Sequence, residues 1–231
     1  MKKILIIGAN SDIAKEFIKI SISKNLYLYL ALRDNKYSSK FISELSLDQK
    51  SNYKVLEIDL EKNILFENYI NDLDKSIDMI IFFSGYYEKP EVNHQKISVV
   101  NFLGPKNFIL KLIKKKEFVN LNKIICLTSI AGDREPNYNQ SYSRSKRDIS
   151  NFLKKLNKSE KKINFIDIKP GYVKTKMTHN LKLNKLLISK PQYIAKNIYL
   201  SLDTTKNEIY IPFYWKIIML VYKLIFFKKS K

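Results

Sequence analysis

Tyr142 and Lys146 are the pair of residues in this sequence best suited to proton chemistry. They lie four positions apart in the run Tyr-Ser-Arg-Ser-Lys, so a helix would place both side chains on one face. A phenol has a reference pKa of about 10, and a neighbouring ammonium group favours the phenolate and lowers that value. The pair is therefore a candidate for general acid–base catalysis at a substrate oxygen.

Three other runs could bring groups to the same site. Ser129 ends an apolar run thirteen residues before Tyr142 and opens the motif Ser-Ile-Ala-Gly, a spacing that lets a loop return its hydroxyl to the tyrosine. Asn101 is a polar residue within an otherwise apolar stretch that we predict to be helical. The run Pro-Gly-Tyr-Val-Lys-Thr, residues 170–175, directly follows another apolar run.

A further candidate is the turn at residues 8–14, between the first apolar run and the first amphipathic segment. A glycine there lets backbone amides approach a pyrophosphate at the N-terminus of a helix. Because this turn contains one glycine, Gly8, it is also compatible with an ordinary strand–helix turn in which Ser11 or Asp12 caps the helix.

Apolar runs alternate with amphipathic segments along the chain, which is the pattern of repeated strand–helix–strand units. The predicted strands are residues 3–7, 26–32, 53–58, 79–83, 123–128, 164–168 and 208–211. The predicted helices are residues 12–23, 38–45, 65–73, 97–116, 139–156 and 192–202. The pattern predicts a single-domain α/β fold of the Rossmann type, a doubly wound parallel sheet of about seven strands with helices on both faces.

Taken together, these motifs resemble those of the short-chain dehydrogenase/reductase family. Six occur in the family's order and spacing over roughly residues 3–211: Gly-x-x-x-x-x-Ala at 8–14, Phe-Ser-Gly at 83–85, Asn101, Ser129-x-Ala-Gly, Tyr142-x-x-x-Lys146 and Pro170-Gly-x-Val-x-Thr. The resemblance implies an enzyme that transfers a hydride between a nicotinamide cofactor and a carbonyl or alcohol substrate. A cofactor-binding sensor or scaffold on the same fold, without turnover, is the alternative.

The resemblance also implies roles for individual residues. Tyr142 would exchange a proton with the substrate oxygen, and Ser129 would hydrogen-bond that oxygen. Lys146 would hold the nicotinamide ribose and lower the pKa of the tyrosine, and Asn101 would anchor a water molecule of a proton relay. The residues implied to bind the cofactor are Gly8, Asn10, Ser11, Asp12, Ile13, Ala14, Arg33, Asp59, Leu60, Gly85, Tyr142, Lys146, Pro170, Gly171, Val173 and Thr175. No metal is expected.

Two regions bear on the choice of cofactor. Asp12 stands where the family has a second glycine, and its carboxylate would bring negative charge near a pyrophosphate. After the second predicted strand, Leu32 stands near the position of the acid that binds the ribose of NAD, and Arg33 follows it. An arginine there accommodates the 2′-phosphate of NADP, so we predict NADP rather than NAD. Asp34 is the alternative ribose ligand if the register differs by one residue.

The net charge of +20 comes mainly from lysine, since only four of the 42 basic residues are arginine, and the lysines are spread over the whole chain. Proteins that read nucleic acid rely largely on clustered arginine, so we predict no nucleic-acid partner. The charge leaves open an attraction to anionic substrates or to an acidic membrane surface.

The lone cysteine, Cys126, is predicted to be a buried thiol in a cytoplasmic enzyme.

The last segment, residues 213–231, is nearly all apolar before it ends in lysines. The apolar part, residues 213–227, is shorter than the roughly 20 residues that span a bilayer, and its aromatic and basic residues are typical of a helix at a membrane interface. A helix packed on its own domain or at a dimer contact is the alternative.

We therefore predict a cofactor-binding domain at 1–212, with a substrate loop near 174–190, and a C-terminal helix. A homo-oligomer is expected, cytoplasmic or peripheral at the inner face of the membrane, with a ketosugar or lipid-linked sugar as a candidate substrate.

Overall fold

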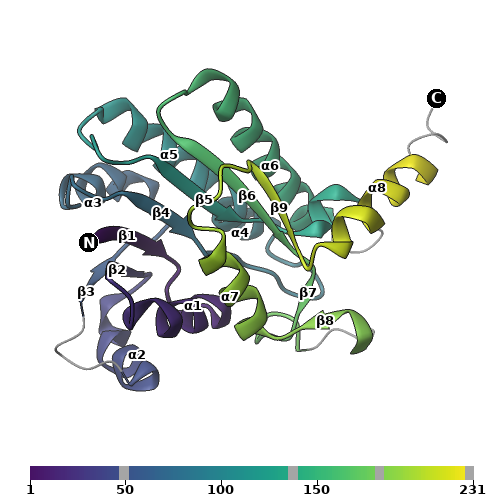
Figure 1. The fold of residues 1–231 in the computed structure, drawn as a ribbon, viewed down its shortest axis with the longest axis horizontal. Helices are drawn as coiled ribbons and strands as arrows, with labels where there is room; N and C mark the ends of the chain where they lie inside the picture. Colours follow the sequence, from purple (N-terminus) through teal and green to yellow (C-terminus); the bar gives the residue numbers. More distant parts are fainter. Residues whose placement is uncertain (47–51, 135–139, 180–184, 227–231) are drawn as a thin grey trace.

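A computed structural model of the chain describes residues 1–46, 52–134, 140–179 and 185–226 (Figure 1). Its centre is a parallel sheet of seven strands in the order β3-β2-β1-β4-β5-β6-β9. The strands are β1 (Lys2–Ile7), β2 (Leu26–Leu32), β3 (Tyr53–Glu57), β4 (Met79–Phe82), β5 (Lys123–Leu127), β6 (Asn164–Pro170) and β9 (Glu208–Ile211). The predicted doubly wound α/β fold is confirmed, and the ends of the strands differ from the predicted ends by two residues at most.

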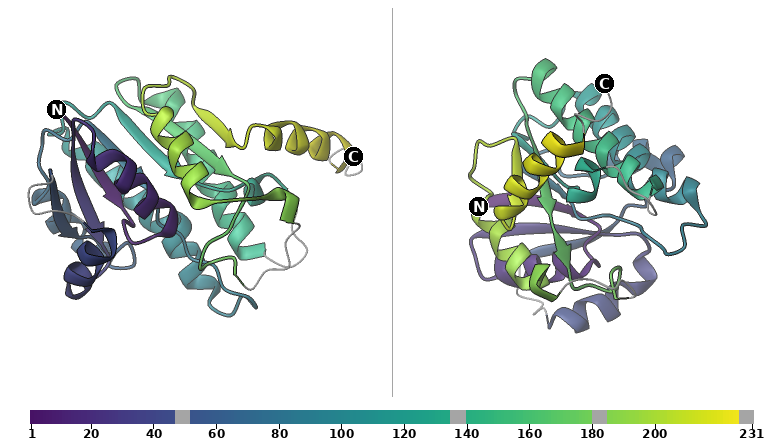
Figure 2. Two further views of the ribbon diagram at one scale, coloured as in Figure 1. Left: turned by 60° about the horizontal axis from the view of Figure 1, so that its bottom comes forward. Right: turned by 90° about the vertical axis from the view of Figure 1, so that its right-hand side faces the viewer.

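Helices cover both faces of this sheet (Figure 2). On one face lie α1 (Asp12–Ile22), α2 (Ser38–Leu45) and α7 (Pro191–Leu200). On the other face lie α3 (Phe66–Asn71), α5 (Gly104–Lys115) and α6 (Gln140–Ser159). The side chains of β1 alternate between the two layers: Ile4 and Ile6 belong to one core, and Leu5 and Ile7 to the other. Burial on both faces explains why the strands are continuous apolar runs.

The strand order reverses between β1 and β4. From β1 the chain runs outward to β2 and β3, returns to β4, and then continues through β5 and β6 to β9. The connections therefore diverge beyond the carboxyl ends of β1 and β4, which is where ligands bind in sheets of this type. The candidate residues of the sequence meet at this edge, because Gly8 follows β1, Gly85 follows β4, Ser129 follows β5 and Gly171 follows β6.

The predicted helix at 97–116 is more complex than its pattern indicates. α4 (His94–Ser98), a π-helical turn (Val99–Leu103) and α5 follow one another without a break. Pro105 has no N–H, so it cannot bond to the carbonyl of Asn101, its partner four residues earlier in a regular α-helix. The wider turn includes the buried Asn101 and packs it beneath the loop that follows β4.

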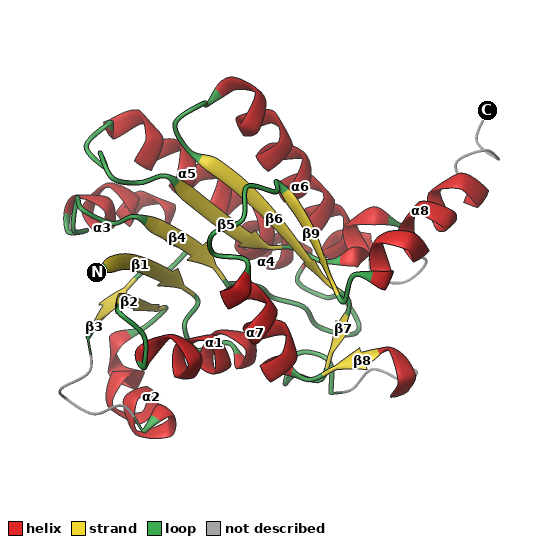
Figure 3. Cartoon of the chain, viewed as in Figure 1, coloured by secondary structure: helices red, strands yellow, loops and turns green. Residues whose placement is uncertain are grey.

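Two short strands were not predicted. β7 (Tyr172–Val173) and β8 (Ile188–Ser189) pair in parallel (Figure 3). β7 directly precedes the predicted substrate loop at 174–190 and β8 lies within it, while residues 180–184 of the loop lie outside the described residues. The C-terminal helix was predicted, and α8 (Tyr214–Phe226) projects from the body of the protein (Figure 2). None of the helices described has both the length and the apolar character needed to cross a membrane.

Candidate active site

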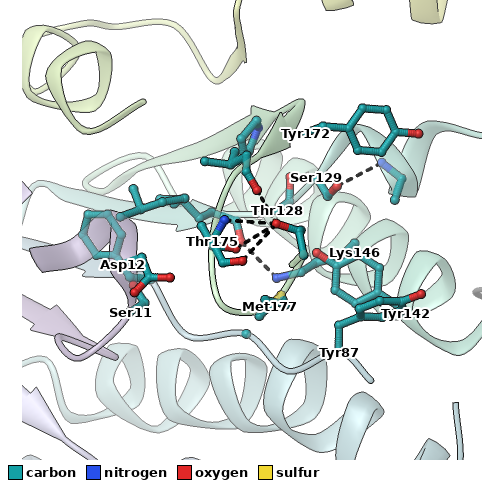
Figure 4. Close-up of a pocket in the computed structure, with 18 of the residues that line it drawn as sticks. Ser11, Asp12, Tyr87, Thr128, Ser129, Tyr142, Lys146, Tyr172, Thr175 and Met177 are labelled. Carbon is teal, nitrogen blue, oxygen red and sulfur yellow. Dashed lines mark hydrogen bonds between the residues drawn. The ribbon is translucent and has the colours of Figure 1, made fainter. Parts of the chain in front are cut away.

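A cavity of about 310 Å³ lies beyond the carboxyl ends of β1, β4, β5 and β6 (Figure 4). Its walls come from the first turn, the loop after β4, the turn after β5, helix α6 and the segment after β6. Tyr142, Lys146 and Ser129 all line it. The reversal of strand order has therefore brought together residues from five separate segments.

Lys146 is buried beside this cavity on α6. Its Nζ donates a hydrogen bond of 3.1 Å to the carbonyl of Leu127 at the end of β5. The same atom lies 5.8 Å from the centre of the Tyr142 ring. Removal from water disfavours the ammonium and lowers the pKa of Lys146 to about 8, although the Asp167 carboxylate opposes this shift. Lys146 is therefore still mostly charged at neutral pH.

Tyr142 lies one helical turn before Lys146, with its ring half-buried. Burial raises the pKa of Tyr142 to about 12, and a hydrogen bond with Ser129 offsets only part of that rise. The net shift of the tyrosine pKa is therefore upward in this structure, opposite in direction to the lowering expected from Lys146 alone. Desolvation of the phenol dominates, and the ammonium is bonded to a backbone carbonyl. Tyr142 is protonated at neutral pH, as a proton donor must be.

Ser129 reaches the tyrosine because the chain turns sharply after β5. It caps a 3₁₀ turn (Ile130–Asp133), and its Oγ accepts a hydrogen bond of 3.1 Å from the backbone N–H of Ala131. Gly132 lets this turn approach α6 closely, since a Cβ there would lie 2.9 Å from the backbone nitrogen of Arg147. Arg147 in turn donates from Nε to the Gly132 carbonyl over 3.0 Å. The glycine of the Ser-x-Ala-Gly motif is therefore a packing requirement.

Both polar atoms of the Asn101 side chain are bonded to the backbone of Tyr86. Oδ1 accepts a hydrogen bond of 3.0 Å from the Tyr86 N–H, and Nδ2 donates one of 2.7 Å to the Tyr86 carbonyl. Asn101 lies outside the cavity lining and holds the loop after β4 that forms part of it. A water-anchoring role would therefore fall to its backbone carbonyl rather than to its amide.

The same loop also holds Tyr142, through residues that no sequence motif marks. The Glu91 carboxylate accepts hydrogen bonds of 3.0 Å from the backbone N–H groups of Ser141 and Tyr142, at the first turn of α6. The Tyr87 ring packs edge-on against the Tyr142 ring, with 5.1 Å between their centres. Neither contact has a local signal in the sequence, because each joins residues about fifty positions apart.

The turn after β1 combines a glycine conformation with a helix cap. Gly8 has a φ of +80°, and a Cβ there would lie 2.7 Å from the backbone nitrogen of Ser84. Ser11, rather than Asp12, is the N-cap of α1. The Asp12 carboxylate instead accepts a hydrogen bond of 2.7 Å from the backbone N–H of Lys176. Asp12 thereby joins the first turn to the segment that follows β7.

A second hollow, of about 100 Å³, adjoins the cavity at Ser84 and Gly85, which line both. Residues that follow β2 and β3 form its rim. The Arg33 guanidinium lies 3.6 Å from the Glu61 carboxylate, and the Lys96 ammonium lies 3.5 Å from the same carboxylate. Arg33 and Lys96 thus place two cations at this hollow beside the carboxylates of Asp59 and Glu61, and a guanidinium can bind an anionic group in a fork geometry.

Asp34, the alternative ribose ligand, is directed elsewhere. Its carboxylate accepts a hydrogen bond of 3.0 Å from the backbone N–H of Lys36 and pairs with the Lys36 ammonium at 2.9 Å. The side-chain contacts of Asp34 therefore belong to its own turn, and Arg33 is the residue that lines the hollow.

The two hollows bring together most of the residues that the sequence indicated. Those that line the larger cavity are Asn10, Ser11, Asp12, Ile13, Gly85, Ser129, Tyr142, Lys146, Pro170, Gly171, Val173 and Thr175. Those that line the smaller hollow are Gly8, Arg33, Asp59, Leu60 and Gly85. Ala14 and Asn101 are buried next to the hollows without lining them. The larger cavity also includes Arg134, Tyr172 and Met177, which were not singled out beforehand.

The joined hollows have features that suit a dinucleotide. The Ser84 hydroxyl, at their junction, is buried and has no hydrogen-bond partner within the described residues. A buried polar atom of this kind needs a partner, which the polar groups of a ligand can supply. The first residues of α1 line the larger cavity beside it, and the N-terminus of a helix attracts phosphate. In the described part of the chain, no cluster of His, Cys, Asp or Glu has the composition of a metal site.

Comparison with known proteins gives a consistent result. A family model described as short chain dehydrogenase matches residues 2–186. An alcohol dehydrogenase from the archaeon Thermococcus sibiricus, complexed with 5-hydroxy-NADP, is 20% identical with a TM-score of 0.76, over 91% of this chain and 95% of that one. A short chain dehydrogenase from Burkholderia cenocepacia, in complex with NADP, is 16% identical with a TM-score of 0.78, over 100% and 97%. A 3-oxoacyl-[acyl-carrier protein] reductase from Brucella melitensis is 16% identical with a TM-score of 0.73, over 91% and 89%. At these identities the structural likeness establishes the fold.

Proposed function

The chain belongs to the short-chain dehydrogenase family of oxidoreductases, and from this premise we propose that it reduces a carbonyl group of a small molecule with NADPH. The observation that carries the proposal is that Tyr142, Ser129 and Lys146 line one cavity. The presence of all three groups in contact with the cavity gives the non-catalytic alternative, a sensor or scaffold, no support.

The smaller hollow supports NADP as the cofactor. Arg33 and Lys96 present cations where the adenosine end of a dinucleotide would lie, and the Asp34 carboxylate is occupied by Lys36. A guanidinium binds phosphate oxygens in a fork geometry, which suits the 2′-phosphate. Two similar structures were solved with NADP or an NADP derivative bound.

In the proposed reaction the cofactor supplies a hydride to the carbonyl carbon, and the protein supplies position and a proton. The Ser129 hydroxyl would donate a hydrogen bond to the carbonyl oxygen, and the Tyr142 hydroxyl would transfer its proton to that oxygen as the alcohol forms. Tyr142 is then left as a phenolate, whose charge the nearby Lys146 ammonium stabilises. General acids of this kind typically contribute about 100- to 10,000-fold to a rate.

The proton that Tyr142 loses must be replaced from solvent. We propose that the backbone carbonyl of Asn101 holds a water molecule on that route. Two features support this role: the carbonyl cannot receive its regular helical bond at Pro105, and Asn101 lies under the loop that carries Gly85. A Cβ on Gly85 would lie 3.5 Å from the Asn101 Oδ1 and 3.6 Å from the Lys146 Nζ, so the three residues are close neighbours.

The lining of the cavity supports a proposal for the substrate class. Tyr87, Tyr172 and Met177 contribute apolar surface to it, and the Arg134 guanidinium lies 5.6 Å from the centre of the Tyr172 ring. Apolar surface together with a guanidinium suits a molecule with both an apolar part and an anionic group. We propose a ketosugar that carries phosphate, as in nucleotide-linked or lipid-linked sugars.

The test is the loss of NADPH absorbance in the presence of a panel of ketones that includes phosphorylated ketosugars. The natural protein should oxidise NADPH only when a ketone is present, and Tyr142→Phe should reduce turnover by about 100-fold or more. Tyr193→Phe is the matched control, because Tyr193 is an exposed tyrosine on α7. Equal turnover by Tyr142→Phe and Tyr193→Phe would contradict the assignment of the proton donor.

We also propose that the enzyme works in the cytoplasm as a homo-oligomer. The single cysteine, Cys126, is a buried free thiol, as expected for a protein of a reducing compartment. Leu103 and Leu110 are partly exposed apolar residues on the segment that includes α5, and they support a contact between copies on that side. Sedimentation of the purified protein measures the state directly.

A further inference from the structure

Helix α8 carries its apolar side chains on the outside. Ile217, Leu220 and Leu224 are 56%, 59% and 57% exposed. The other large apolar residues of this surface are Phe213, Ile218, Val221, Ile225 and Phe226. A helix on a globular protein normally has the reverse arrangement, with its apolar side chains against the core. We call this set of exposed residues the outer face of α8.

The inner side of α8 is firmly attached to the protein. Trp215 and Met219 are buried, and a Cβ on Gly171 would overlap the Trp215 ring, so the two residues are in direct contact. One turn further on, the Lys223 ammonium pairs with the Asp133 carboxylate at 3.0 Å. The outer face is therefore presented by an anchored helix, and Figure 2 shows this helix projecting from the body of the protein.

We propose that the outer face of α8 is a membrane-docking surface, which lies on an anionic lipid bilayer. This inference does not depend on the proposed reaction. Its two supports are the charge of the protein and the shape of the exposed surface.

The charge favours an anionic partner. No aspartate or glutamate follows Glu208 in the sequence, whereas Lys216 lies on α8 and Lys228, Lys229 and Lys231 come after it. The chain as a whole has a net charge of +20. A second copy placed on the same face would bring like charges together, whereas lysines near anionic headgroups strengthen binding to a bilayer.

The width of the outer face also favours lipid. At about 100° per residue, the exposed apolar positions from Phe213 to Ile225 cover roughly half of the helix circumference. A single partner helix covers a narrower seam, whereas headgroups and acyl chains enclose a helix that lies partly immersed in the interface. Thirteen residues in a helix reach about 20 Å, less than the roughly 30 Å of a hydrocarbon core, so α8 would lie in the interface and not cross it.

The position of α8 places the cavity next to the docked surface. Tyr172 lines the cavity and packs edge-on against Trp215, with 5.6 Å between ring centres. Asp133, the partner of Lys223, belongs to the turn that Ser129 caps. A membrane-bound α8 would therefore hold one wall of the cavity close to the lipid surface.

The experiment is co-sedimentation of the full chain with vesicles of phosphatidylcholine alone and of phosphatidylcholine mixed with phosphatidylglycerol. The full chain should bind the mixed vesicles, less so the neutral ones, and binding should weaken as salt is raised. Leu220→Glu with Leu224→Glu should reduce the bound fraction by about tenfold or more, because it removes apolar area from the interface.

The matched control is Ile64→Glu with Val119→Glu. These two residues are also exposed and apolar, they lie outside α8, and their replacement changes the net charge by the same amount. The control pair should bind mixed vesicles nearly as well as the natural chain. Trp215 is the only tryptophan, so an unchanged fluorescence spectrum shows that α8 still packs in the Leu220 and Leu224 variant.

Three results would overturn the proposal. One is failure of the natural chain to bind mixed vesicles. The second is equal binding by the α8 pair and the control pair. The third is a dimer that the α8 substitutions convert to a monomer while vesicle binding is absent, which would assign the outer face to a second copy of the chain.

Discussion

The Glu91 carboxylate accepts a hydrogen bond of 3.0 Å from the backbone N–H of Tyr142. Because it also accepts the N–H of Ser141, this side chain caps the first turn of α6 from a distant loop. The helix dipole favours a negative charge at that end. Glu91 therefore fixes the start of the helix that carries both Tyr142 and Lys146, and we propose that it positions Tyr142 as the proposed proton donor.

We expect Glu91→Ala to lower kcat by roughly ten- to a hundredfold, since small displacements of a catalytic group have effects of this size. The affinity for NADPH should change little, because Glu91 contacts the start of α6 and not the turn after β1. Glu91→Gln should restore part of the rate, because its amide oxygen can still accept a hydrogen bond. Steady-state kinetics and NADPH titration measure both quantities, with Glu160→Ala, just beyond the C-terminal end of α6, as control. An equal loss of rate and of NADPH affinity would point to general unfolding instead.

The pH dependence of stability should reveal the burial of Lys146. The pKa of Lys146 is lowered to about 8 by desolvation, so above that pH the unfolded chain binds more protons than the folded one. The unfavourable contribution of the buried ammonium is therefore full below about pH 8 and fades as the pH rises towards the ordinary lysine pKa near 10.4.

Lys146→Met should accordingly be more stable than the natural protein at neutral pH, and the difference should shrink above about pH 8. Urea denaturation of the two proteins without cofactor, at several pH values, gives the difference in unfolding free energy. Lys196→Met, at an exposed position of α7, is the control and should show a difference that is constant with pH. A difference for Lys146→Met that is equally constant would show that its ammonium is not desolvated.

Arg33 should decide between the two nicotinamide cofactors. Arg33→Ala should weaken NADPH binding by about tenfold, because it removes a charge-assisted hydrogen bond at a partly solvated rim. NADH binding should stay nearly unchanged. Fluorescence titration with both cofactors measures the two affinities. Arg144→Ala removes an exposed arginine on α6 and should alter neither. Equal affinity of the natural protein for NADPH and NADH would refute the assignment.

Asp12 should affect both the affinity for NADPH and the KM of the carbonyl substrate, and two variants can separate these effects. Asp12→Asn keeps an oxygen that can accept the Lys176 N–H but removes a negative charge from the helix end where phosphate would bind. It should tighten NADPH binding by about two- to fivefold and leave the KM of the carbonyl substrate unchanged.

Asp12→Ala should tighten NADPH binding to a similar extent and also raise the KM of the carbonyl substrate, because it releases the segment after β7. The comparison of both variants in one kinetic series separates the charge effect from the structural effect. An unchanged substrate KM in Asp12→Ala would show that the bond to Lys176 does not order the substrate end of the cavity.

The sequence alone determined the elements and most of the local chemistry. Continuous apolar runs such as residues 79–83 mark strands covered on both faces, because such runs have no polar side to expose. Tyr142 and Lys146 could be paired because helical spacing is a local property. The Ser129 and Pro170 motifs could be placed at one edge of the sheet, because the ends of parallel strands meet there.

The tertiary structure decided every property that depends on distant neighbours. The Glu91 carboxylate accepts a hydrogen bond from the Tyr142 N–H, and the Asp12 carboxylate accepts one from the Lys176 N–H. Both bonds join segments that are far apart in the sequence, so no local pattern predicts them. The direction of the pKa shift of Tyr142 depended on how far folding removes the phenol from water. Helix α8 could be predicted from its composition. Which side of it packs on Gly171 and which side stays exposed could not, because the contacts with the rest of the folded chain set that orientation.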